Sequence, residues 1–393
     1  MILVTGGAGY IGSFTVRELI NNGWEVVVLD SLENGHEAAL SAALGGQGSG
    51  VSSKLHLEIV DLADIAGVRR VFDTYPIEAV IDFVAYLSVG ESMENPKKYM
   101  INNVENFIKL LDVMREKGCK YIIKSSTAAV YGDPEDKYFP LEENYLQDFK
   151  PGKSCLLEGH WDGQKVKKNE FLGKILESYQ QMFALRQDLL LTDEEKIKLM
   201  IPSSVYGLTK LFDEIIMEKY DKLYGIKCVA LRYFNVCGAS LDGKMGDDKP
   251  EPTNLMTRTI LSILGNLGKL QVFGNDYPTK DGTGVRDYIH PLDLADGHVK
   301  ALKLLLDGDK SDVFNLGTGT GYSVLEVLSE VEKASGRKIN YKVVDRRPGD
   351  PAVSYANPKR ANDKLNWKAK YSLADMAVTA WKWHSTHLKG YGD

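Results

Sequence analysis

The glycine-rich stretch at residues 5–13 constrains the fold more than any other part of this chain. It reads TGGAGYIGS and lies between an apolar run and an amphipathic run. Gly6, Gly9 and Gly12 have the spacing of a turn that lets the backbone approach a pyrophosphate and lets a helix pack closely on a strand. The unpaired amide groups at the start of that helix would bind the anion. Glycines also mark ordinary turns, so the motif needs support from elsewhere in the chain.

Asp30 supplies this support. It stands at the end of the second apolar run, where an acidic residue accepts hydrogen bonds from the ribose hydroxyls of a bound adenosine. A carboxylate at this place disfavours the additional phosphate of NADP. The two features together predict a site for NAD.

Apolar, β-rich runs alternate with amphipathic helical runs through the first half of the chain. This alternation is typical of βαβ units, and therefore of a parallel sheet with helices on both faces. We expect an α/β protein with a Rossmann-like, doubly wound parallel sheet. The runs are Ile2–Thr5, Tyr10–Asn22, Glu25–Leu29, His56–Val60, Ile65–Tyr75, Ala79–Val84, Val104–Lys117 and Tyr121–Ser126.

The character of the chain changes near Asn235. Beyond this residue, Gly and Pro interrupt shorter strands and helices, such as the helical run Leu325–Gly336. We therefore expect an NAD-binding domain over residues 1–235 and a smaller α/β substrate-binding domain over residues 236–393, interleaved at their edges. The total of 393 residues suits two domains, or one domain with a large addition.

One segment interrupts the alternation between Tyr145 and Pro202. It contains a candidate helix, residues 171–183, with apolar side chains at helical spacing, and Thr192 and Glu195 have the spacing of a capping box. Connections of this length are uncommon without structure of their own. We therefore expect an insertion at about residues 147–198, whose apolar stripe packs on the body of the protein near the mouth of the site or on a second subunit.

Charge and composition exclude several classes of protein. Lys and Arg number 48 against 54 Asp and Glu, a net charge of 48 − 54 = −6, which does not suit a nucleic-acid-binding or membrane-binding face. The first turn follows after only four residues, which leaves no room for a signal peptide, and no later run reaches the length of a membrane helix. These features predict a cytoplasmic protein.

Cysteine and histidine give no sign of a metal centre. Cys119, Cys155, Cys228 and Cys237 are scattered and are expected to be reduced, mostly buried thiols. His384 and His387 stand three positions apart, but the surrounding segment offers no further ligands, so a surface pair is expected.

Tyr206 and Lys210 are one helical turn apart, so a helix would place both on one face. A tyrosine acts as a base near neutrality only if its pKa falls by roughly three units from about 10, and a neighbouring ammonium favours the phenolate. Such pairs also occur by chance. Thr127 strengthens the hypothesis, because it ends a predicted parallel strand, where α/β sheets bind their ligands, and its hydroxyl can relay a proton.

Four further segments resemble a known family. They are VGES at Val89–Ser92, LRYFNVCGA at Leu231–Ala239, FGNDYPTKDGTGVRDYIHPLDLADGH at Phe273–His298 and RRPGD at Arg346–Asp350. With the motifs above, they resemble the extended short-chain dehydrogenase/reductase superfamily and, within it, the UDP-glucose 4-epimerase family. The resemblance covers nearly the whole chain apart from the insertion.

The resemblance implies roles for individual residues. It implies that Thr127, Tyr206 and Lys210 are catalytic. In addition to the glycines Gly6, Gly9 and Gly12, the implied NAD contacts are Tyr10, Ile11, Asp30, Asn34, Asp61, Leu62, Phe83, Asn102, Tyr206, Lys210 and Phe234. With Thr127, the implied substrate contacts are Asn235, Asn254, Leu255, Phe273, Arg286, Arg347, Asp350 and Ser354, the two arginines facing the diphosphate.

The implied reaction is the reversible C4 epimerisation of UDP-galactose and UDP-glucose, within galactose metabolism. The C4 hydride passes transiently to tightly bound NAD, Tyr206 takes the proton of the 4-hydroxyl directly or through Thr127, and the 4-keto sugar turns over and regains the hydride on its other face. A homodimer is implied by the resemblance alone.

The chain departs from the family pattern at a few positions. Thr127 replaces the commoner serine and keeps the hydroxyl. Leu87 and Asp82 replace a lysine and a histidine, which affects the expected affinity for NAD. Ser354 is a small residue at the position that gates sugar size, so UDP-N-acetylglucosamine and UDP-N-acetylgalactosamine are expected substrates as well.

Two alternatives share many of these features. A nucleotide-sugar dehydratase would need an Asp-Glu pair directly after Thr127, where this chain has Ala128 and Ala129. A catalytically silent NAD-sensing scaffold would use the insertion to hold a partner, but it would not need the catalytic three residues.

Overall fold

The computed structural model describes residues 1–45, 54–148, 159–161, 164–166, 168–182, 186–198, 201–249, 252–347 and 350–392. Within these ranges, no helix is both long enough and apolar enough to cross a membrane.

A seven-stranded parallel sheet forms the larger part of the molecule. Its strands run in the order β12-β8-β5-β4-β1-β2-β3. The chain therefore leaves β1 in one direction and returns on its other side at β4, and the crevice at the carboxyl ends of such strands is where doubly wound sheets bind ligands. The bounds are β1 Ile2–Thr5, β2 Val26–Asp30, β3 Leu55–Ile59, β4 Ala79–Asp82, β5 Tyr121–Thr127, β8 Lys227–Tyr233 and β12 Asp312–Leu316.

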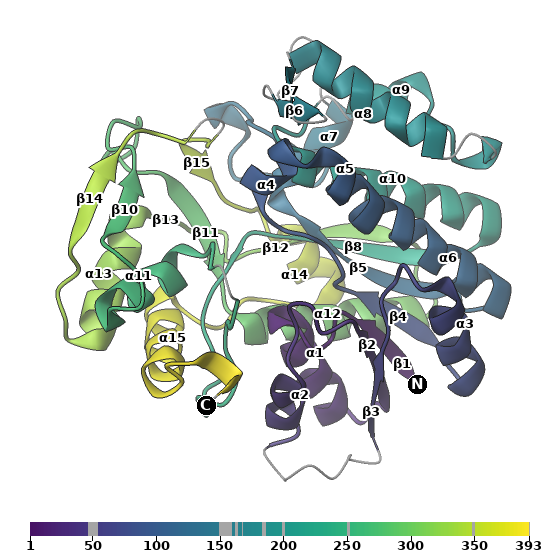
Figure 1. Ribbon diagram of the computed structural model, residues 1–393, viewed down its shortest axis with the longest axis horizontal. Helices are drawn as coiled ribbons and strands as arrows, with labels where there is room; N and C mark the ends of the chain where they lie inside the picture. Colours follow the sequence, from purple (N-terminus) through teal and green to yellow (C-terminus); the bar gives the residue numbers. More distant parts are fainter. Residues whose placement is uncertain are drawn as a thin grey trace.

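Helices cover both faces of this sheet (Figure 1). One face packs against α3, α6 and α10, and the other against α1, α2, α12 and α14. The bounds are α1 Tyr10–Asn21, α2 Glu37–Ala43, α3 Ile65–Thr74, α6 Asn106–Lys117, α10 Val205–Tyr224, α12 Pro291–Leu306 and α14 Lys359–Leu365. Three short elements join β4 to α6, namely α4 Val89–Glu94, α5 Pro96–Tyr99 and the π-helical turn η1 Met100–Glu105.

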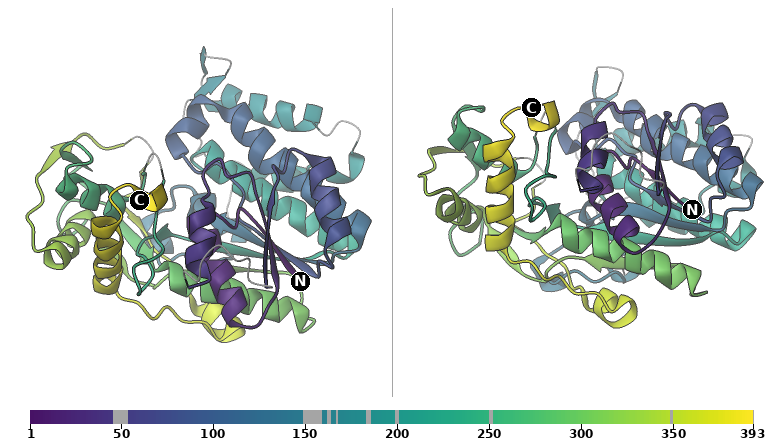
Figure 2. Two further views of the ribbon diagram at one scale, coloured as in Figure 1. Left: turned by 60° about the horizontal axis from the view of Figure 1, so that its bottom comes forward. Right: turned by 90° about the horizontal axis from the view of Figure 1, so that it is seen from below.

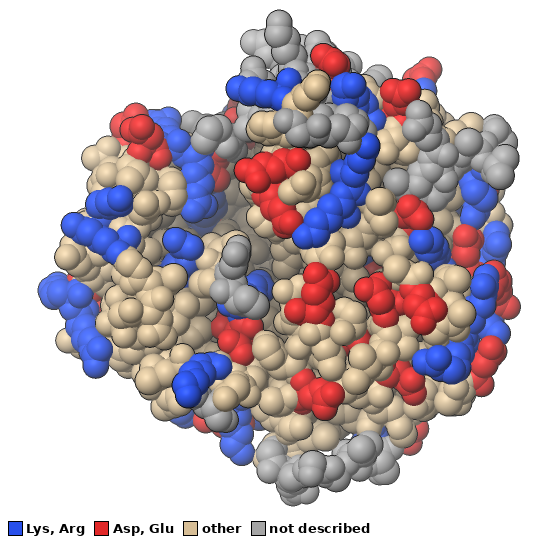
Figure 3. Space-filling model, viewed as in Figure 1, with Lys and Arg blue, Asp and Glu red and all other residues tan. Residues whose placement is uncertain are grey.

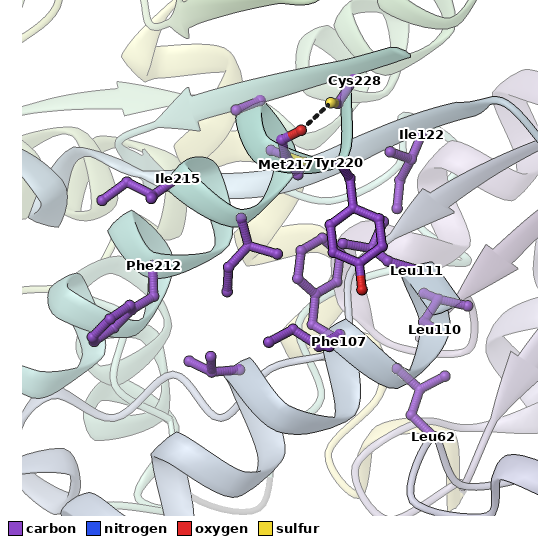
Figure 4. Close-up of a cluster of buried hydrophobic side chains, with 14 of the residues drawn as sticks. Leu62, Phe107, Leu110, Leu111, Ile122, Phe212, Ile215, Met217, Tyr220 and Cys228 are labelled. Atoms are coloured by element: carbon purple, nitrogen blue, oxygen red, sulfur yellow. Dashed lines mark hydrogen bonds between the residues drawn. The ribbon is translucent and has the colours of Figure 1, made fainter. Parts of the chain in front are cut away.

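The apolar layer between α6, α10 and β5 is shown in Figure 4. Phe107 and Leu111 on α6 meet Phe212 and Tyr220 on α10, and all four side chains are buried. Helix α10 begins where the hydroxyl of Ser204 accepts the amide of Gly207 at 3.1 Å. The α10 backbone is thus held by a cap at one end and by this core along its length.

The smaller part of the molecule lies beside the carboxyl ends of the large sheet (Figure 2). Its helices α11, α13 and α15 share one apolar core. Its strands are β9 Asn235–Val236, β10 Leu270–Phe273, β11 Val285–Ile289, β13 Gly321–Ser323, β14 Tyr341–Val344 and β15 Val353–Ser354, and its helices are α11 Leu255–Leu264, α13 Val324–Ser335 and α15 Leu373–Thr386. The α/β class and the Rossmann-like sheet with a smaller second part are therefore confirmed.

A division of the chain after residue 235 does not describe this arrangement. Strand β12 pairs with β8, and α12 packs on α1 and β5, so both belong to the large sheet although they lie far beyond Asn235. Apolar side chains such as Leu302 and Phe314 drive this return, because they complete the core on the α1 face.

The insertion packs on the outer side of α10. Tyr179 of α8 stacks on Phe212 with ring centroids 4.6 Å apart, and Ile175 and Leu189 are buried with them. Thr192 and Glu195 form the expected capping box, with bonds of 3.2 and 2.7 Å. The described elements are α7 Tyr145–Asp148, β6 Gly159–Trp161, β7 Gln164–Val166, α8 Lys168–Met182, η4 Gln187–Leu189 and α9 Asp193–Lys198. Phe183, the last residue of the expected helix, lies outside the described residues.

The described part of the stripe thus packs on the body of the protein, as one of the two expectations had it, but against Phe212 of α10 and not at the mouth of the site. Arg186 extends this contact, since it binds Asp112 of α6 at 2.8 Å and the hydroxyl of Tyr220 at 3.2 Å.

Candidate active site

A cavity of about 990 Å³ lies at the carboxyl ends of the sheet strands. Figure 3 shows a hollow between the two parts of the molecule, with charged side chains around its rim. The lining comes from the turn before α1, the ends of β2, β4, β5 and β8, the start of α10 and the segment before α11. Residues from both halves of the sequence therefore meet in one pocket.

The glycine-rich turn forms the floor of the cavity. Gly6 has a φ of +70°, which side chains rarely adopt. A Cβ on Gly12 would lie 2.2 Å from the carbonyl oxygen of Gly6, so any larger residue would push the helix off the turn. Gly9 is the N-cap of α1 and offers no side chain to its free amides. The arrangement suits a bound pyrophosphate on the helix N-terminus.

Asp30 lies at the end of β2 and lines the same pocket. Its carboxylate accepts the backbone amides of Ala8 and Leu32, both at 2.9 Å. Burial raises the pKa of this carboxyl, and the two amides oppose the rise. Asp30 therefore fixes the glycine-rich turn while keeping further lone pairs for ribose hydroxyls.

All the predicted NAD and catalytic residues line this one cavity. The lining includes Gly6, Gly9, Tyr10, Ile11, Gly12, Asp30, Asn34, Asp61, Leu62, Phe83, Asn102, Thr127, Tyr206, Lys210 and Phe234, together with Asn235 and Asn254 from the predicted substrate set. The lining residues suit a dinucleotide, because the glycine turn and Asp30 follow β1 and β2, whereas Tyr206 and Lys210 lie beside β5 on the other side of β4.

Tyr206 and Lys210 lie in the first turns of α10. The backbone amide of Tyr206 donates to the hydroxyl of Ser92 at 3.1 Å, which ties the start of α10 to α4. The ammonium of Lys210 donates to the carbonyl of Ser125 at 2.8 Å and to its hydroxyl at 3.3 Å. Helix α10 and strand β5 thus hold both groups at the pocket wall.

The structure does not show the lowered pKa of Tyr206 that the spacing of Tyr206 and Lys210 predicts. Burial raises the pKa of Tyr206 to about 12, whereas a hydrogen bond from the Thr127 hydroxyl works in the opposite direction. Burial and the nearby Lys124 ammonium lower the pKa of Lys210 to about 7. The spacing of the two residues indicates their electrostatic attraction, but it does not reveal that both side chains are removed from water. Burial is the largest cause of both pKa shifts.

The remaining predicted substrate residues form a second cluster outside the cavity lining. Arg347 lies over the ring of Phe273, its guanidinium carbon 3.9 Å from the centroid. Arg286 lies 3.6 Å from Asp350 and is paired with Ser354 in the register of β11 and β15. Leu255 begins α11, next to Asn254. The cluster joins residues spread over the second half of the sequence.

The two departures from the family pattern have different surroundings. Leu87 is 46% exposed and lines the cavity. Asp82 is fully buried, does not line it, and binds Thr5 and Lys124 instead. An effect of Asp82 on NAD would therefore have to act through its neighbours.

Several cavity residues were not found from the sequence, and three of them lie together. His36 lies 3.1 Å from the carbonyl oxygen of Asp248, and the amide of Tyr391 in η5, Gly390–Gly392, donates to the Asp248 carboxylate at 2.8 Å. They come from three distant places in the chain and belong to no shared motif. Only the folded chain brings them to the edge of the pocket. Ser92 was missed as well, although it ends the VGES segment that carried the resemblance.

The structure shows the positions of the histidine pair considered in the sequence and of the cysteines within the described residues. Cys119, Cys228 and Cys237 are buried free thiols, as expected, and Cys155 lies outside the described residues. The expectation of a surface pair was wrong for His384, which is only 6% exposed because α15 turns it inward. Within the described ranges, no cluster of three or more His, Cys, Asp or Glu is suited to a metal.

Comparisons with known proteins agree with this geometry. The model of the NAD dependent epimerase/dehydratase family matches residues 2–155, and that of GDP-mannose 4,6 dehydratase matches residues 178–379. A UDP-glucose 4-epimerase of Bacillus subtilis is 41% identical over 392 residues, covering 99% of this chain and 98% of that relative. A UDP-glucose 4-epimerase of Mus musculus is 37% identical over 395 residues, covering 100% and 98%.

Solved structures are similar over the full length. UDP-glucose 4-epimerase from Bifidobacterium longum, in complex with NAD+ and UDP, has a TM-score of 0.79 at 35% identity, covering 99% of each chain. The UDP-Glc/GlcNAc 4-epimerase of Campylobacter jejuni has a TM-score of 0.70 at 30% identity, covering 98% of this chain and 99% of that one.

Proposed function

The chain belongs to the NAD-dependent epimerase/dehydratase family and, within it, to the UDP-glucose 4-epimerases, and from this premise we propose that it interconverts UDP-glucose and UDP-galactose with NAD as cofactor. One observation carries the proposal. A single cavity holds a dinucleotide turn with its ribose acid at one end and a Thr-Tyr-Lys set at the other.

NAD, when bound, supplies the acceptor and the returning donor for the C4 hydride of the sugar. The glycine-rich turn and Asp30 would hold its pyrophosphate and adenosine ribose. Because hydride leaves and returns within one cycle, no net oxidation occurs and the cofactor need not leave the protein.

The chain's own residues handle the proton. Tyr206 takes the proton of the sugar 4-hydroxyl and returns it, either directly or through the hydroxyl of Thr127. Burial raises the pKa of Tyr206 to about 12. The positive charge of the oxidised nicotinamide, beside the ammonium of Lys210, would lower it in the complex.

The second cluster supplies the substrate half of the proposal. Arg286 and Arg347 would bind the UDP diphosphate, since a planar guanidinium matches its oxygens with two parallel bonds. Neither arginine is among the residues that line the cavity.

We extend the proposed substrates to UDP-N-acetylglucosamine and UDP-N-acetylgalactosamine. Ser354 is a small residue on β15, next to Arg286. A relative from Campylobacter jejuni is described as a UDP-Glc/GlcNAc 4-epimerase. A small side chain at this position leaves room for the acetyl group.

Part of the chain also matches the family model of GDP-mannose 4,6 dehydratase, so dehydration of the sugar is a second candidate reaction. A dehydratase has to remove a proton from C5 and expel water, which requires an acid and a base beside Thr127. Ala128 and Ala129, which occupy these positions, have no titratable group. We therefore propose epimerisation and not elimination.

Incubation with UDP-galactose, without added NAD, tests the function. UDP-glucose is the expected product, and Tyr206→Phe should slow its formation by about a thousandfold. A 4-keto-6-deoxy product would show a dehydratase instead. NAD occupancy with no product at all would show a scaffold.

We also propose a homodimer, on family grounds. The insertion already covers the outer side of α10 with Tyr179, Ile175 and Arg186. A partner subunit would therefore meet the insertion or another surface of the chain. Light scattering at micromolar concentration distinguishes the dimer from a monomer.

A further inference from the structure

A row of buried charges lies behind the catalytic pair. Asp82 of β4 is opposite Lys124 of β5 in the sheet register, and Asp213 of α10 packs over them. The exposed fractions of the three side chains are 1% or less, and none of them lines the cavity. Buried ion pairs seldom stabilise a fold more than apolar side chains of equal size do. Stability alone therefore does not explain the row.

Lys124 is at the centre of the row. Its ammonium donates to the carboxylate of Asp82 at 2.5 Å and lies 3.4 Å from that of Asp213. It also lies 4.2 Å from the ring centroid of Phe107 on α6, one of the core residues in Figure 4. The cation is thus enclosed by β4, α6 and α10.

Asp82 connects the row to the pocket wall. Its carboxylate accepts the hydroxyl of Thr5 at 2.5 Å and the backbone amide of Val84 at 3.0 Å. The latter bond sets the direction of the chain directly after β4, where Phe83 and Val84 enter the cavity lining. The row therefore acts on the shape of the cofactor pocket as well as on its charge.

Asp213 connects the row to the catalytic lysine. It follows Lys210 on α10 by almost one turn, so both point to the same side of the helix. No described residue donates a hydrogen bond of good geometry to the Asp213 carboxylate, whose ion-pair partner is the Lys124 ammonium at 3.4 Å. Lys210, for its part, forms no ion pair in the described part of the chain and donates only to Ser125. The charges of Asp213 and Lys210 are thus both buried, opposite in sign and close together on α10, so each affects the protonation of the other.

Several charged or titratable groups surround Lys210 and Tyr206 and affect their pKa values. Asp82 and Lys124 face Lys210 from the strands, and Asp213, Glu214 and Tyr206 share its helix. Tyr233 on β8 adds a phenol that interacts with Tyr206. Glu214 is compensated by Arg232 at 2.5 Å and accepts the Ser126 hydroxyl at 2.5 Å. Because Glu214 is already paired with Arg232, the row of Asp82, Lys124 and Asp213 contains the charges whose removal should change the pKa of Lys210.

We propose that Asp82, Lys124 and Asp213 are positioning residues for the reaction, which together set the charge of Lys210 and thereby the pH range in which Tyr206 can accept a proton. This inference rests on the proposed epimerase function. Burial raises the pKa of Asp213 to about 7, so above that pH its carboxylate favours the ammonium form of Lys210. The positive Lys124 disfavours the ammonium form.

The two effects have opposite signs, which makes the proposal testable. In Asp213→Asn, the Lys210 ammonium loses a stabilising charge, so the alkaline limb of the kcat profile should move about one pH unit lower. In Lys124→Met, a repelling charge disappears and the limb should move upward by a similar amount. The double variant Lys124→Met/Asp213→Asn should fall between them, near the wild type.

The experiment measures kcat and KM for UDP-galactose from pH 6 to 10, together with NAD content. A second readout is independent of turnover: tyrosinate absorbance, taken as the difference between each protein and its Tyr206→Phe partner, follows the ionisation of Tyr206 directly. Asp293→Asn is the matched control, because Asp293 is an equally buried aspartate that binds the amides of Lys370 and Tyr371 away from the cavity.

Opposite displacements of the two single variants, with the Asp293→Asn profile in place, support the proposal. The proposal is wrong if the pH profiles of kcat for the variants superimpose on that of the wild type, or if they only decrease in height. A purely structural role lowers kcat without shifting the alkaline limb of the profile. If Lys124→Met does not fold, the Asp213→Asn and double-variant profiles decide. A wild-type protein that does not convert UDP-galactose refutes the proposed function instead, and the tyrosinate titration then still tests the row.

Discussion

The ammonium of Lys210 lies 2.8 Å from the carbonyl oxygen of Ser125, two residues before Thr127. This bond holds the lysine to strand β5 and joins the two elements that carry the catalytic residues, α10 and β5. The positions of Tyr206 and Lys210 are therefore set by the packing of α10 on β5, and the long insertion between these two elements in the sequence does not disturb that packing.

Tyr206→Phe should lower kcat by about a thousandfold, because loss of a general base typically costs 10²- to 10⁴-fold. The bound NAD should remain, since the phenyl ring keeps the shape of the pocket. The measurement is conversion of UDP-galactose alongside NAD released on denaturation. Tyr220→Phe is the control, because its buried phenol binds Asp112 and Arg186 away from the cavity. An active Tyr206→Phe protein would remove the assigned base.

Asp30→Ala should reduce NAD affinity by about 10- to 100-fold, because hydrogen bonds to a charged group are worth about 1.5–3 kcal/mol. The same change frees the amides of Ala8 and Leu32. NAD content of the purified protein, followed by titration with NAD, measures the loss. The exposed Asp73→Asn serves as control. Unchanged NAD content in Asp30→Ala would contradict the assigned ribose contact.

Ser354→Tyr should abolish action on UDP-N-acetylgalactosamine and leave turnover of UDP-galactose within about threefold. A phenol on β15 would fill the space that the acetyl group needs, whereas the plain hexose needs less room. Product analysis with both substrates measures the ratio, and Ser354→Ala should keep both activities. If the wild type acts on UDP-galactose and shows no action on the N-acetyl sugar, the proposed wider range is wrong.

Stability should fall as the pH drops from about 6.5 to 4, in part because of His290. Burial lowers its pKa to about 4 from an ordinary value of 6.5, so the unfolded chain binds a proton in this range and the folded chain does not. The loss should reach about 2–3 kcal/mol from this group. His290→Asn keeps an N-cap for α12 and should flatten the fall in urea unfolding.

Thr379→Val checks that interpretation. It removes the hydroxyl that lies 3.2 Å from the His290 ring but leaves the imidazole. It should lower the free energy of unfolding at every pH and keep the slope. A His290→Asn protein with the wild-type slope would exclude His290 as the source.

Tyr179→Ala should lower the free energy of unfolding by about 3 kcal/mol, as expected for a buried aromatic ring. The ring stacks on Phe212, and its hydroxyl donates to the carbonyl of Leu189 at 2.9 Å. kcat should be unchanged, because Phe212 does not line the cavity. Gln180→Ala, at an exposed position of the same helix, is the control. No loss of stability would show that the insertion does not support α10.

The sequence predicted those features that depend on local pattern. The strands and helices around the sheet, the glycine turn, Asp30 and the Thr192 capping box all follow from spacing along a short stretch of chain, and the structure confirms their positions. The Tyr-Lys pair was predictable for the same reason, because one helical turn brings the two residues together.

Features that depend on distant segments could not be predicted in this way. The meeting of His36 and Asp248 needs two pieces of chain that only the fold brings together. The raised pKa of Tyr206 and the lowered pKa of Lys210 follow from burial, which local spacing does not reveal. The row of Asp82, Lys124 and Asp213 has the same origin, since its three members come from two strands and a helix.

The return of β12 to the edge of β8 has a consequence for synthesis on the ribosome. Until residue 316 has emerged, β8 has an unpaired backbone edge, and the apolar face that α12 covers is open to water. The large sheet therefore lacks its seventh strand until residues 312–316 have been translated, although its first six strands are made earlier. The two halves mature together, and a gene fragment that stops near residue 240 should yield an aggregating product.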